Sequence, residues 1–178
     1  LEQGKEAIVL IPEIALTFQT VLRFYRRFGD QVSIIHSKLS AGERYDQFER
    51  ARRGEVKGMI GPRSALFTPF SHLGIIVIDE EHEGSYKSEN APRYHAREAA
   101  IERARMCGAY VVLGSATPSV DSYERAREGI YQLYELPLRV ENRAMPGTEV
   151  VDLREELRMG NRSIFSARLK ELMEDRLG

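Results

Sequence analysis

Short apolar runs, rich in β-branched residues and separated by longer amphipathic stretches, constrain the fold of this 178-residue chain more than any other feature. Most runs are continuously apolar, as expected for strands that are buried on both faces of a sheet. The stretches between them carry helix signals, such as the capping box of Ser40 and Glu43. This alternation predicts an α/β fold, a mostly parallel sheet with helices on both faces. The predicted strands are 7–11, 32–36, 57–61, 74–79, 109–114 and 149–153, and the predicted helices are 13–28, 41–53, 93–106, 118–128 and 166–176.

The pattern weakens from about residue 136, where the stretch LPLRVENRAMPG contains prolines and a glycine without a regular period. Such a stretch is typical of a linker. We therefore predict a partial domain at 1–135, a linker at 136–148 and a further segment at 149–178. The last segment is too short for a core of its own, so it is either an added strand and helix on the main sheet or the start of a second domain.

The composition narrows the classes of protein. The formal net charge of -1 gives no global electrostatic attraction for nucleic acid, so such binding would have to use local patches. Cys107 is the only cysteine, which excludes an intrachain disulfide and a cysteine-based zinc site built from this chain alone. No apolar run approaches the roughly 20 residues of a membrane span, so we expect a soluble, cytoplasmic protein with no membrane partner.

Polar residues follow several of the predicted strands directly. In a parallel α/β sheet the carboxyl ends of the strands gather at one edge, where ligands bind. The strand 74–79 runs into three carboxylates and a histidine, and other strands are followed by an acid, hydroxyls or an arginine. The groups are Pro12-Glu13, Gly61 to Ser64, Asp79 to His82, and Gly114 to Thr117.

Asp79 and Glu80 are the clearest chemical candidates in this set. A carboxylate at the tip of a buried strand is rigidly held, and Mg²⁺ is usually bound by one or two carboxylates together with substrate phosphates. The second carboxylate could orient or deprotonate a water molecule. On spacing alone, alternatives stay open: the acids could form a solvated turn, His82 could be an exposed loop residue, and residues 114–118 could be a turn with a helix cap.

Taken together and in order, these loops resemble the motifs of superfamily 2 helicases. DEEH after an apolar strand is similar to motif II and GSATPS after the next strand to motif III, while IPEIALT is similar to motif Ia and GPRSALFTPF to motif Ib. Within that superfamily the resemblance is to the PriA type, the primosomal protein N′ family of replication-restart DNA helicases. DEEHEGSYK with PRYHAREAA is similar to a stretch of that family, and EVVDLREELRMGNRSIFS resembles its entry into the second motor domain. The resemblance implies a RecA-like helicase motor domain 1.

For the nucleotide site, the resemblance implies separate roles. Asp79 would hold the Mg²⁺ of Mg-ATP, and Glu80 would position the water that attacks the γ-phosphate. Glu81 and His82 would complete the catalytic motif, with His82 passing information between the nucleotide and DNA sites. The coupling loop would consist of Ser115, Ala116 and Thr117, which would hydrogen-bond to motif II.

The resemblance also implies contacts to single-stranded or forked DNA. Backbone amides at the helix start marked by Pro12, Glu13 and Thr17 would hold phosphates. Because the chain has no tryptophan, stacking on bases would fall to Tyr86 and Tyr94. The full set of implied DNA contacts adds Arg63 and Ser64 in motif Ib, and Lys87 and Arg93 in the loop that senses single-stranded DNA.

One motif of the family is absent from this sequence. A P-loop, G-x-x-x-x-G-K-[ST], precedes motif Ia by one helix in such helicases, and no stretch of the chain matches it. We therefore expect a fragment that lacks its P-loop strand and helix and that hydrolyses little or no ATP alone, from a parent that is an ATP-dependent 3′→5′ DNA helicase. The arginine finger and the zinc-binding cysteines of the family would lie beyond Gly178. Loss of a central strand predicts a gap in the sheet or an unpaired edge, and hence a dimer or aggregate.

The parent would act with primosome and replication-restart proteins. Two other functions are compatible with the residues. A metal-dependent phosphoesterase or nuclease built from Asp79, Glu80 and His82 would cleave its substrate with a divalent metal and without ATP. A non-catalytic module would bind DNA or protein, and its DNA contacts would weaken as the salt concentration rises.

Overall fold

The computed structural model describes residues 3–137 and 146–177 of the chain. The chain forms two compact units, Leu1–Leu133 and Tyr134–Gly178. No helix in the described residues is long and apolar enough to cross a membrane.

The first unit alternates strands and helices as the sequence predicts. Short 3₁₀ turns occur after α1, between β3 and β4, and between β4 and α3. In chain order the elements are β1 (Glu6–Leu10), α1 (Phe18–Phe28), η1 (Gly29–Gln31), β2 (Val32–Ile34), α2 (Ala41–Arg52), β3 (Gly58–Gly61), η2 (Arg63–Phe67), β4 (Leu73–Ile78), η3 (Gly84–Tyr86), α3 (Ala96–Cys107), β5 (Tyr110–Leu113) and α4 (Val120–Arg127).

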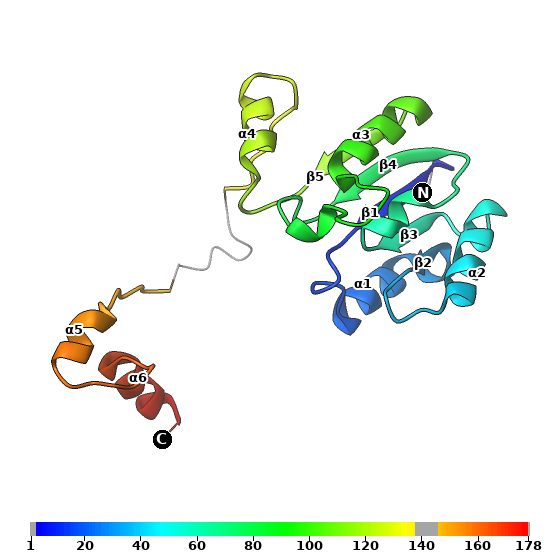
Figure 1. The fold of residues 1–178 in the computed structure, drawn as a ribbon. Helices are drawn as coiled ribbons and strands as arrows, with labels where there is room; N and C mark the ends of the chain where they lie inside the picture. The colour runs from blue at the N-terminus through cyan, green and yellow to red at the C-terminus, as the bar shows by residue number, and fades with distance from the viewer. Residues whose placement is uncertain (1–2, 138–145, 178) are drawn as a thin grey trace. The chain divides into compact units, whose positions relative to one another are not determined.

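All strand pairs in the sheet are parallel, in the order β2-β3-β1-β4-β5 (Figure 1). β1 lies in the middle, where Val9 is paired with Ile60 of β3 and with Val77 of β4. The predicted α/β fold with a parallel sheet is confirmed. Neighbouring strands are hydrogen-bonded without a gap, so the expected gap inside the sheet is not present. Among the described strands, β2 and β5 each have one partner only, as the outer strands of any open sheet do, so the unpaired edge expected from a lost strand stays a prediction.

Helices pack on both faces of the sheet, because successive strand residues point to opposite sides. Ile8 and Leu10 of β1 belong to one core cluster, which also contains Ala51 of α2 and Ala100 of α3. On the opposite face, Ile11 and Ile60 form a second cluster with Phe24 and Phe28 of α1. This two-sided burial explains why the strands read as continuously apolar in the sequence.

The β5 end of the sheet is less well covered than its centre. Tyr110 is 78% exposed and Val112 is 46% exposed. The two residues alternate with Val111 and Leu113, which pack against the main core cluster. One face of β5 therefore presents apolar side chains to solvent, beside a free backbone edge.

The second unit contains α5 (Leu153–Arg158) and α6 (Ala167–Leu177). The strand predicted at 149–153 is wrong, because residues 149–152 pair with no other described residue and Asp152 instead caps α5 by accepting a hydrogen bond from the Arg154 amide. Glu156 joins the two helices, since its Oε2 atom accepts from Asn161 Nδ2 at 2.6 Å and from the Ala167 amide at 2.9 Å. Part of the predicted linker, residues 138–145, lies outside the described residues.

Candidate functional site

The carboxyl ends of β1, β4 and β5 meet at one edge of the sheet. The Asp79 amide donates to the Leu10 carbonyl at 2.9 Å, and the Glu81 amide donates to the Gly114 carbonyl at 3.0 Å. These backbone bonds hold the D-E-E-H stretch between the first and fifth strands. Residues that are far apart in sequence, including Gly114 and the loop after it, are thereby brought beside Asp79.

Asp79 and Glu80 lie at the open side of this edge. Asp79 is exposed, and its Oδ1 atom accepts from the Glu80 amide at 3.1 Å. Glu80 has φ of 48°, in the left-handed region that residues other than glycine rarely adopt. A strained, non-glycine residue held by its neighbours is typical of a functional position. The strain turns the chain sharply after β4, so that successive acids point to different surroundings.

The donor set fits Mg²⁺ held jointly with phosphates. An exposed carboxylate at a rigid strand end suits an ion that keeps several waters and takes only one or two protein carboxylates. A cage made wholly of protein ligands is not formed, because the described residues contain no group of three or more His, Cys, Asp or Glu side chains that could hold a metal ion. Asp79 is therefore the residue that would hold such an ion, with Glu80 beside it.

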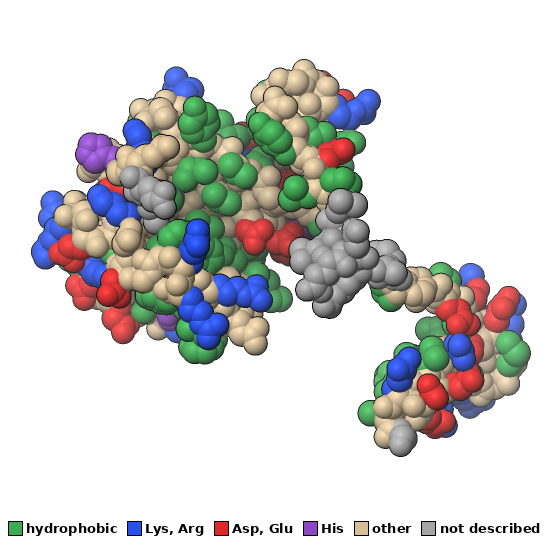
Figure 2. Space-filling model, turned by 180° about the vertical axis from the view of Figure 1, so that it is seen from behind, with side chains coloured by type: hydrophobic (Ala, Val, Ile, Leu, Met, Phe, Trp, Pro, Cys, Tyr) green, Lys and Arg blue, Asp and Glu red, His purple; other side chains and the backbone are tan. Residues whose placement is uncertain are grey.

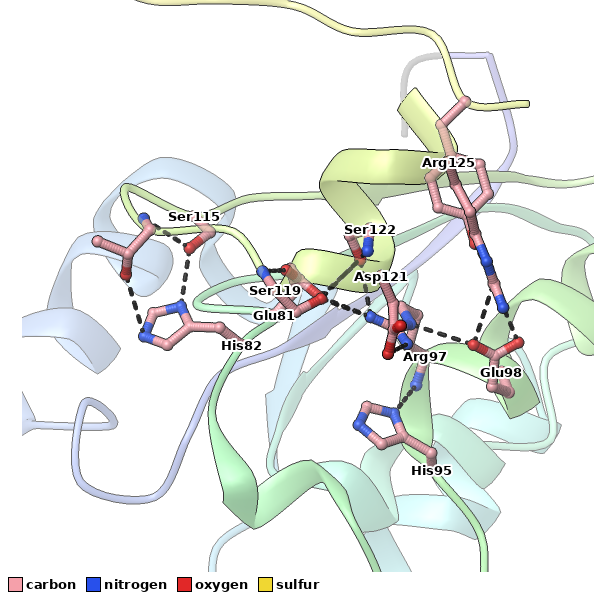
Figure 3. Close-up of polar contacts among 12 residues, drawn as sticks. Glu81, His82, His95, Arg97, Glu98, Ser115, Ser119, Asp121, Ser122 and Arg125 are labelled. Carbon is pink, nitrogen blue, oxygen red and sulfur yellow. Dashed lines mark hydrogen bonds and ion pairs between the residues drawn. The ribbon is translucent and has the colours of Figure 1, made fainter. Parts of the chain in front are cut away.

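His82 contacts the loop that follows β5 (Figure 3). Its Nδ1 atom lies 2.7 Å from Ser115 Oγ, and its Nε2 atom lies 3.5 Å from Thr117 Oγ1. Ser115 Oγ also accepts from the Thr117 amide at 3.0 Å, which closes the loop on itself. Glu80 Oε2 lies 3.7 Å from His82 Nδ1. Three of the implied site residues are thus joined directly, whereas Ala116 is exposed between them.

Glu81 is buried, in contrast to its two acidic neighbours. Figure 3 shows its carboxylate surrounded by the start of α4 and by Arg97 of α3. Its oxygens accept from the Ser119 amide at 2.6 Å, Ser122 Oγ at 2.9 Å and Arg97 Nη1 at 3.2 Å. Only 2% of Glu81 is exposed. Its oxygens are thus occupied by partners within the domain, and the catalytic role implied for Glu81 stays a prediction.

The electrostatics of Glu81 follow from these contacts. Burial raises the pKa of a carboxyl group, but hydrogen bonds from Ser119, Ser122 and Arg97 outweigh it, so the pKa of Glu81 lies below its usual value. Glu81 stays ionised and pairs with a buried cation. Its partners were missed in the sequence because Arg97, Ser119 and Ser122 have no fixed spacing from the D-E-E-H stretch. Ser119, two residues after Thr117, is also the N-cap of α4.

The helix after β1 begins later than predicted. Residues 13–15 form a turn, and α1 starts at Phe18 with Thr17 as its N-cap. Thr17 Oγ1 accepts from the Thr20 amide at 3.3 Å. Pro12 is buried and lies one turn before the helix, so it does not contribute an exposed contact. Glu13 is exposed but also precedes the helix, which leaves Thr17 as the residue at the start of α1.

Arg63 is half-buried and joins η2 to the loop after Glu83. Its Nη1 atom donates to the Ser85 carbonyl at 3.0 Å and to the Lys87 carbonyl at 2.6 Å. Ser64, the next residue of η2, is half-buried as well. The guanidinium group therefore orders the loop, in addition to any contact that it makes outside the protein.

Residues 87–95 form a short hairpin that leads into α3. Lys87 pairs with His95 in an antiparallel bridge, and the Ser88 amide donates to the Tyr94 carbonyl at 2.8 Å. Arg93 is exposed and donates from Nε to the Glu89 carbonyl at 3.2 Å. An open pocket of about 740 Å³ lies in the hairpin, lined by Lys87, Ser88, Glu89, Asn90, Arg93, Tyr94 and His95.

The two tyrosines expected to stack on bases differ in their surroundings. Tyr86 is 1% exposed, so the stacking role expected for it is wrong: its ring has no free face. Tyr94 is partly exposed and packs edge to face against Phe67, with ring centroids 5.3 Å apart. Phe67 is 55% exposed and is a further candidate for stacking that the sequence analysis did not name. The one signal that could have pointed to it is its place in the motif GPRSALFTPF.

An all-parallel sheet with helices on both faces, and with these polar loops at the carboxyl ends of adjacent strands, defines the first unit as a RecA-like α/β domain. The chain belongs to the DEAD/DEAH box helicase family, whose model matches residues 1–126. The resemblance to the PriA type is confirmed by curated relatives. The chain is 57% identical over 175 residues to replication restart protein PriA of Bacillus subtilis, and 46% identical over 175 residues to that of Synechocystis.

These matches cover most of the chain but a small part of each relative. The alignments cover 98% and 96% of this chain, and 22% and 21% of the two relatives. The chain therefore spans about a fifth of the length of the curated relatives that it matches. Among solved structures, the C-terminal domain of the DEAD-box protein Dbp5 matches 72% of the chain and 72% of its own length, with 18% identity and a TM-score of 0.48.

Proposed function

We propose that this chain forms part of an ATP-driven DNA helicase that moves 3′→5′ and acts in replication restart. The observation that carries the proposal is the contact between His82 and Ser115, which joins the D-E-E-H end of β4 to the G-S-A-T loop after β5. A contact between these two loops lets a change at the nucleotide reach the rest of the domain. The family match and the 57% identity to a replication restart protein support it.

In this proposal Asp79 and Glu80 form the nucleotide side of the site. Asp79 holds the Mg²⁺ that accompanies ATP, and the ion neutralises charge on the phosphates. Glu80 positions the attacking water, because it directly follows Asp79 at the open edge of the sheet. His82 stays hydrogen-bonded to Ser115 and senses the occupancy of the site. The sequence has no P-loop motif, so we propose that the chain alone hydrolyses little or no ATP.

The DNA side of the site is formed by η2 and by the 87–95 hairpin. Arg63, Lys87 and Arg93 supply positive charge, and Tyr94 with Phe67 supplies aromatic surface. Cations that follow a backbone together with exposed rings are what proteins use to bind single strands without sequence preference. Thr17, at the start of α1, is a further proposed contact to the DNA. Single-stranded or forked DNA is the proposed ligand, and primosome and restart proteins in the cytoplasm are the proposed partners.

Filter binding tests the DNA side directly on the chain. An oligothymidylate should bind, and its affinity should fall between two salt concentrations as phosphate contacts are screened. Arg93→Ala should weaken binding and reduce the logarithmic salt slope by about 0.7. Arg105→Ala is the matched control, because Arg105 is an exposed arginine of α3 paired with Glu102. Absence of binding, or equal effects of the two substitutions, would overturn the proposed DNA contact.

A further inference from the structure

Arg63 and Asp79 are connected through Tyr86. Arg63 Nη1 donates to the carbonyls of Ser85 and Lys87, the residues on either side of Tyr86. The Tyr86 hydroxyl donates to the Asp79 carbonyl at 2.7 Å. The connection therefore runs from a cation of η2, through a buried tyrosine, to the backbone of the first acid of D-E-E-H.

Tyr86 is well suited to transmit a displacement. Its side chain belongs to the main core cluster, together with Leu66 of η2 and Ile78 at the end of β4. A closely packed ring moves as a rigid body with its neighbours. Burial, reinforced by the negative charges of Asp79, Glu80 and Glu83, raises the pKa of Tyr86 well above its usual value. The hydroxyl thus remains a protonated donor across the pH range in which proteins work.

Arg63 can change its contacts when an anion approaches. Among the described residues it forms no ion pair with a carboxylate, and the two groups to which it donates are neutral carbonyls. Hydrogen bonds between a guanidinium and a phosphate are stronger than those to a carbonyl. A phosphate that draws Arg63 away would release the backbone on both sides of Tyr86.

We propose that Tyr86 is a positioning residue that sets the place of Asp79 according to the state of Arg63. The proposal rests on the proposed function, in which Arg63 faces DNA and Asp79 faces the nucleotide. When Arg63 holds residues 85 and 87, the Tyr86 hydroxyl fixes the Asp79 carbonyl. When Arg63 is drawn to a phosphate, the 85–87 segment relaxes and Asp79 shifts with it. Tyr86 acts through Asp79 and does not touch either ligand.

The first test needs no ligand. Amide resonances of the chain are compared for wild type, Arg63→Met, Tyr86→Phe and the double variant. We expect Arg63→Met to shift the amides of Asp79 and Glu80 in the wild-type background, and to shift them at least twofold less in the Tyr86→Phe background. Equal shifts in both backgrounds would overturn the proposal, since the Tyr86 hydroxyl would then have no part in linking Arg63 to Asp79.

Tyr131→Phe is the matched control for loss of a hydroxyl, because the Tyr131 hydroxyl accepts from Arg125 Nη1 at 2.7 Å away from Asp79. It should leave the response to Arg63→Met unchanged. Tyr86→Phe keeps the buried ring, and circular dichroism melting curves check that each variant is folded. If Tyr131→Phe reduced the response as much as Tyr86→Phe, the effect would be general loosening and the proposal would be wrong.

The second test adds an oligothymidylate to the same samples. In wild type we expect shifts at residues 63–67 and at 79–80, and in Tyr86→Phe shifts at 63–67 with those at 79–80 reduced at least twofold. Undiminished shifts at 79–80 in Tyr86→Phe would overturn the proposal that Tyr86 links Arg63 to Asp79. Absence of shifts at 63–67 in wild type would overturn the DNA contact of the proposed function instead, and the comparison of Arg63→Met backgrounds would still decide the role of Tyr86.

Discussion

Arg97 Nη1 and Glu81 Oε2 lie 3.2 Å apart and form a buried ion pair between α3 and the end of β4. Side-chain exposure is 8% for the arginine and 1% for the glutamate. The same guanidinium nitrogen donates to Ser119 Oγ and Ser122 Oγ, both at 2.7 Å, at the start of α4 (Figure 3). One arginine therefore holds together the segment that carries the acids, the helix that follows the hairpin and the helix that follows the G-S-A-T loop.

Replacement of Arg97 by methionine should destabilise the first unit strongly. Loss of the cation leaves Glu81 charged and buried with only neutral donors, and breaking a buried ion pair in this way costs about 3–5 kcal/mol. Urea unfolding of the chain measures the change in the free energy of unfolding. Arg105→Met, which removes an exposed pair with Glu102, should cost less than about 1 kcal/mol. Similar losses for the two variants would contradict the role assigned to Arg97.

The stability of the chain should fall when the pH drops below 6.5, in part because of His95. Burial and then the charge of Arg97 lower the pKa of His95 from 6.5, so the folded state binds fewer protons than the unfolded state. His95 Nδ1 also caps α3 by accepting from the Arg97 amide at 3.2 Å, and protonation removes that acceptor. Its contribution is complete above pH 6.5 and is lost as the pH falls through the folded pKa.

His95→Asn keeps a residue that can cap a helix but does not titrate. The loss of unfolding free energy between pH 7.5 and pH 5.5, taken from urea curves, should be smaller in this variant than in wild type. Lys87, Glu81 and Glu98 also act on the His95 ring, and they are unchanged in the comparison. An identical pH dependence in the two proteins would contradict the assignment to His95.

Glu80 should tolerate glycine better than its neighbour Glu83 does. The left-handed backbone of Glu80 costs roughly 1–2 kcal/mol for a residue with a side chain. Glycine removes that cost but adds about 0.5–1 kcal/mol of unfolded-state entropy, so Glu80→Gly should leave the free energy of unfolding unchanged or raise it by up to about 1.5 kcal/mol. Glu83 has φ of -63°, so Glu83→Gly gains nothing and should destabilise by about 1 kcal/mol. The reverse order in urea unfolding would show that Glu80 is not strained.

The exposed edge at β5 should make the chain associate at high concentration. Tyr110 and Val112 present apolar surface beside the free edge of the strand. A charge on an edge strand opposes pairing with another chain, so Tyr110→Lys should lower the mean mass in light scattering toward the 20.3 kDa of one chain. Tyr134→Lys changes an equally exposed tyrosine of the second unit and should have no such effect. A wild-type chain that stays a clean monomer would contradict this prediction.

The sheet could be predicted from the sequence because each strand is apolar over its whole length, and both faces of the sheet are in fact buried. On the surface, hydrophobic, basic and acidic side chains lie side by side (Figure 2). The spacing of residues in the sequence therefore does not indicate which surface side chains have a function. The predicted start of α1 is too early because Ile14 and Phe18 are four residues apart, as on one face of a helix, whereas the cap of Thr17 on the Thr20 amide decides where the helix begins. The prediction of a strand at 149–153 was wrong because a short apolar run forms a strand only when it pairs with another strand. The local sequence does not show whether such a partner exists.

Three adjacent acids look alike in a sequence, yet their surroundings separate them completely. Asp79 is exposed, Glu80 is turned by its left-handed backbone, and Glu81 is taken up by Arg97. Tyr86 was misassigned for the same reason, because an aromatic residue in a polar loop is equally compatible with stacking on a base and with burial. Contacts over long sequence separations settle such cases, and a single sequence does not contain them.

The most direct test of the motor function is ATP hydrolysis by a chimera in which this chain replaces the aligned residues of full-length Bacillus subtilis PriA. The chimera should hydrolyse ATP with Mg²⁺ in response to single-stranded DNA, and Glu80→Gln should abolish that turnover without unfolding the protein. The chain alone should hydrolyse little or none. A folded chimera that binds DNA but hydrolyses no ATP, or one that is unaffected by Glu80→Gln, would contradict the account and favour a binding module.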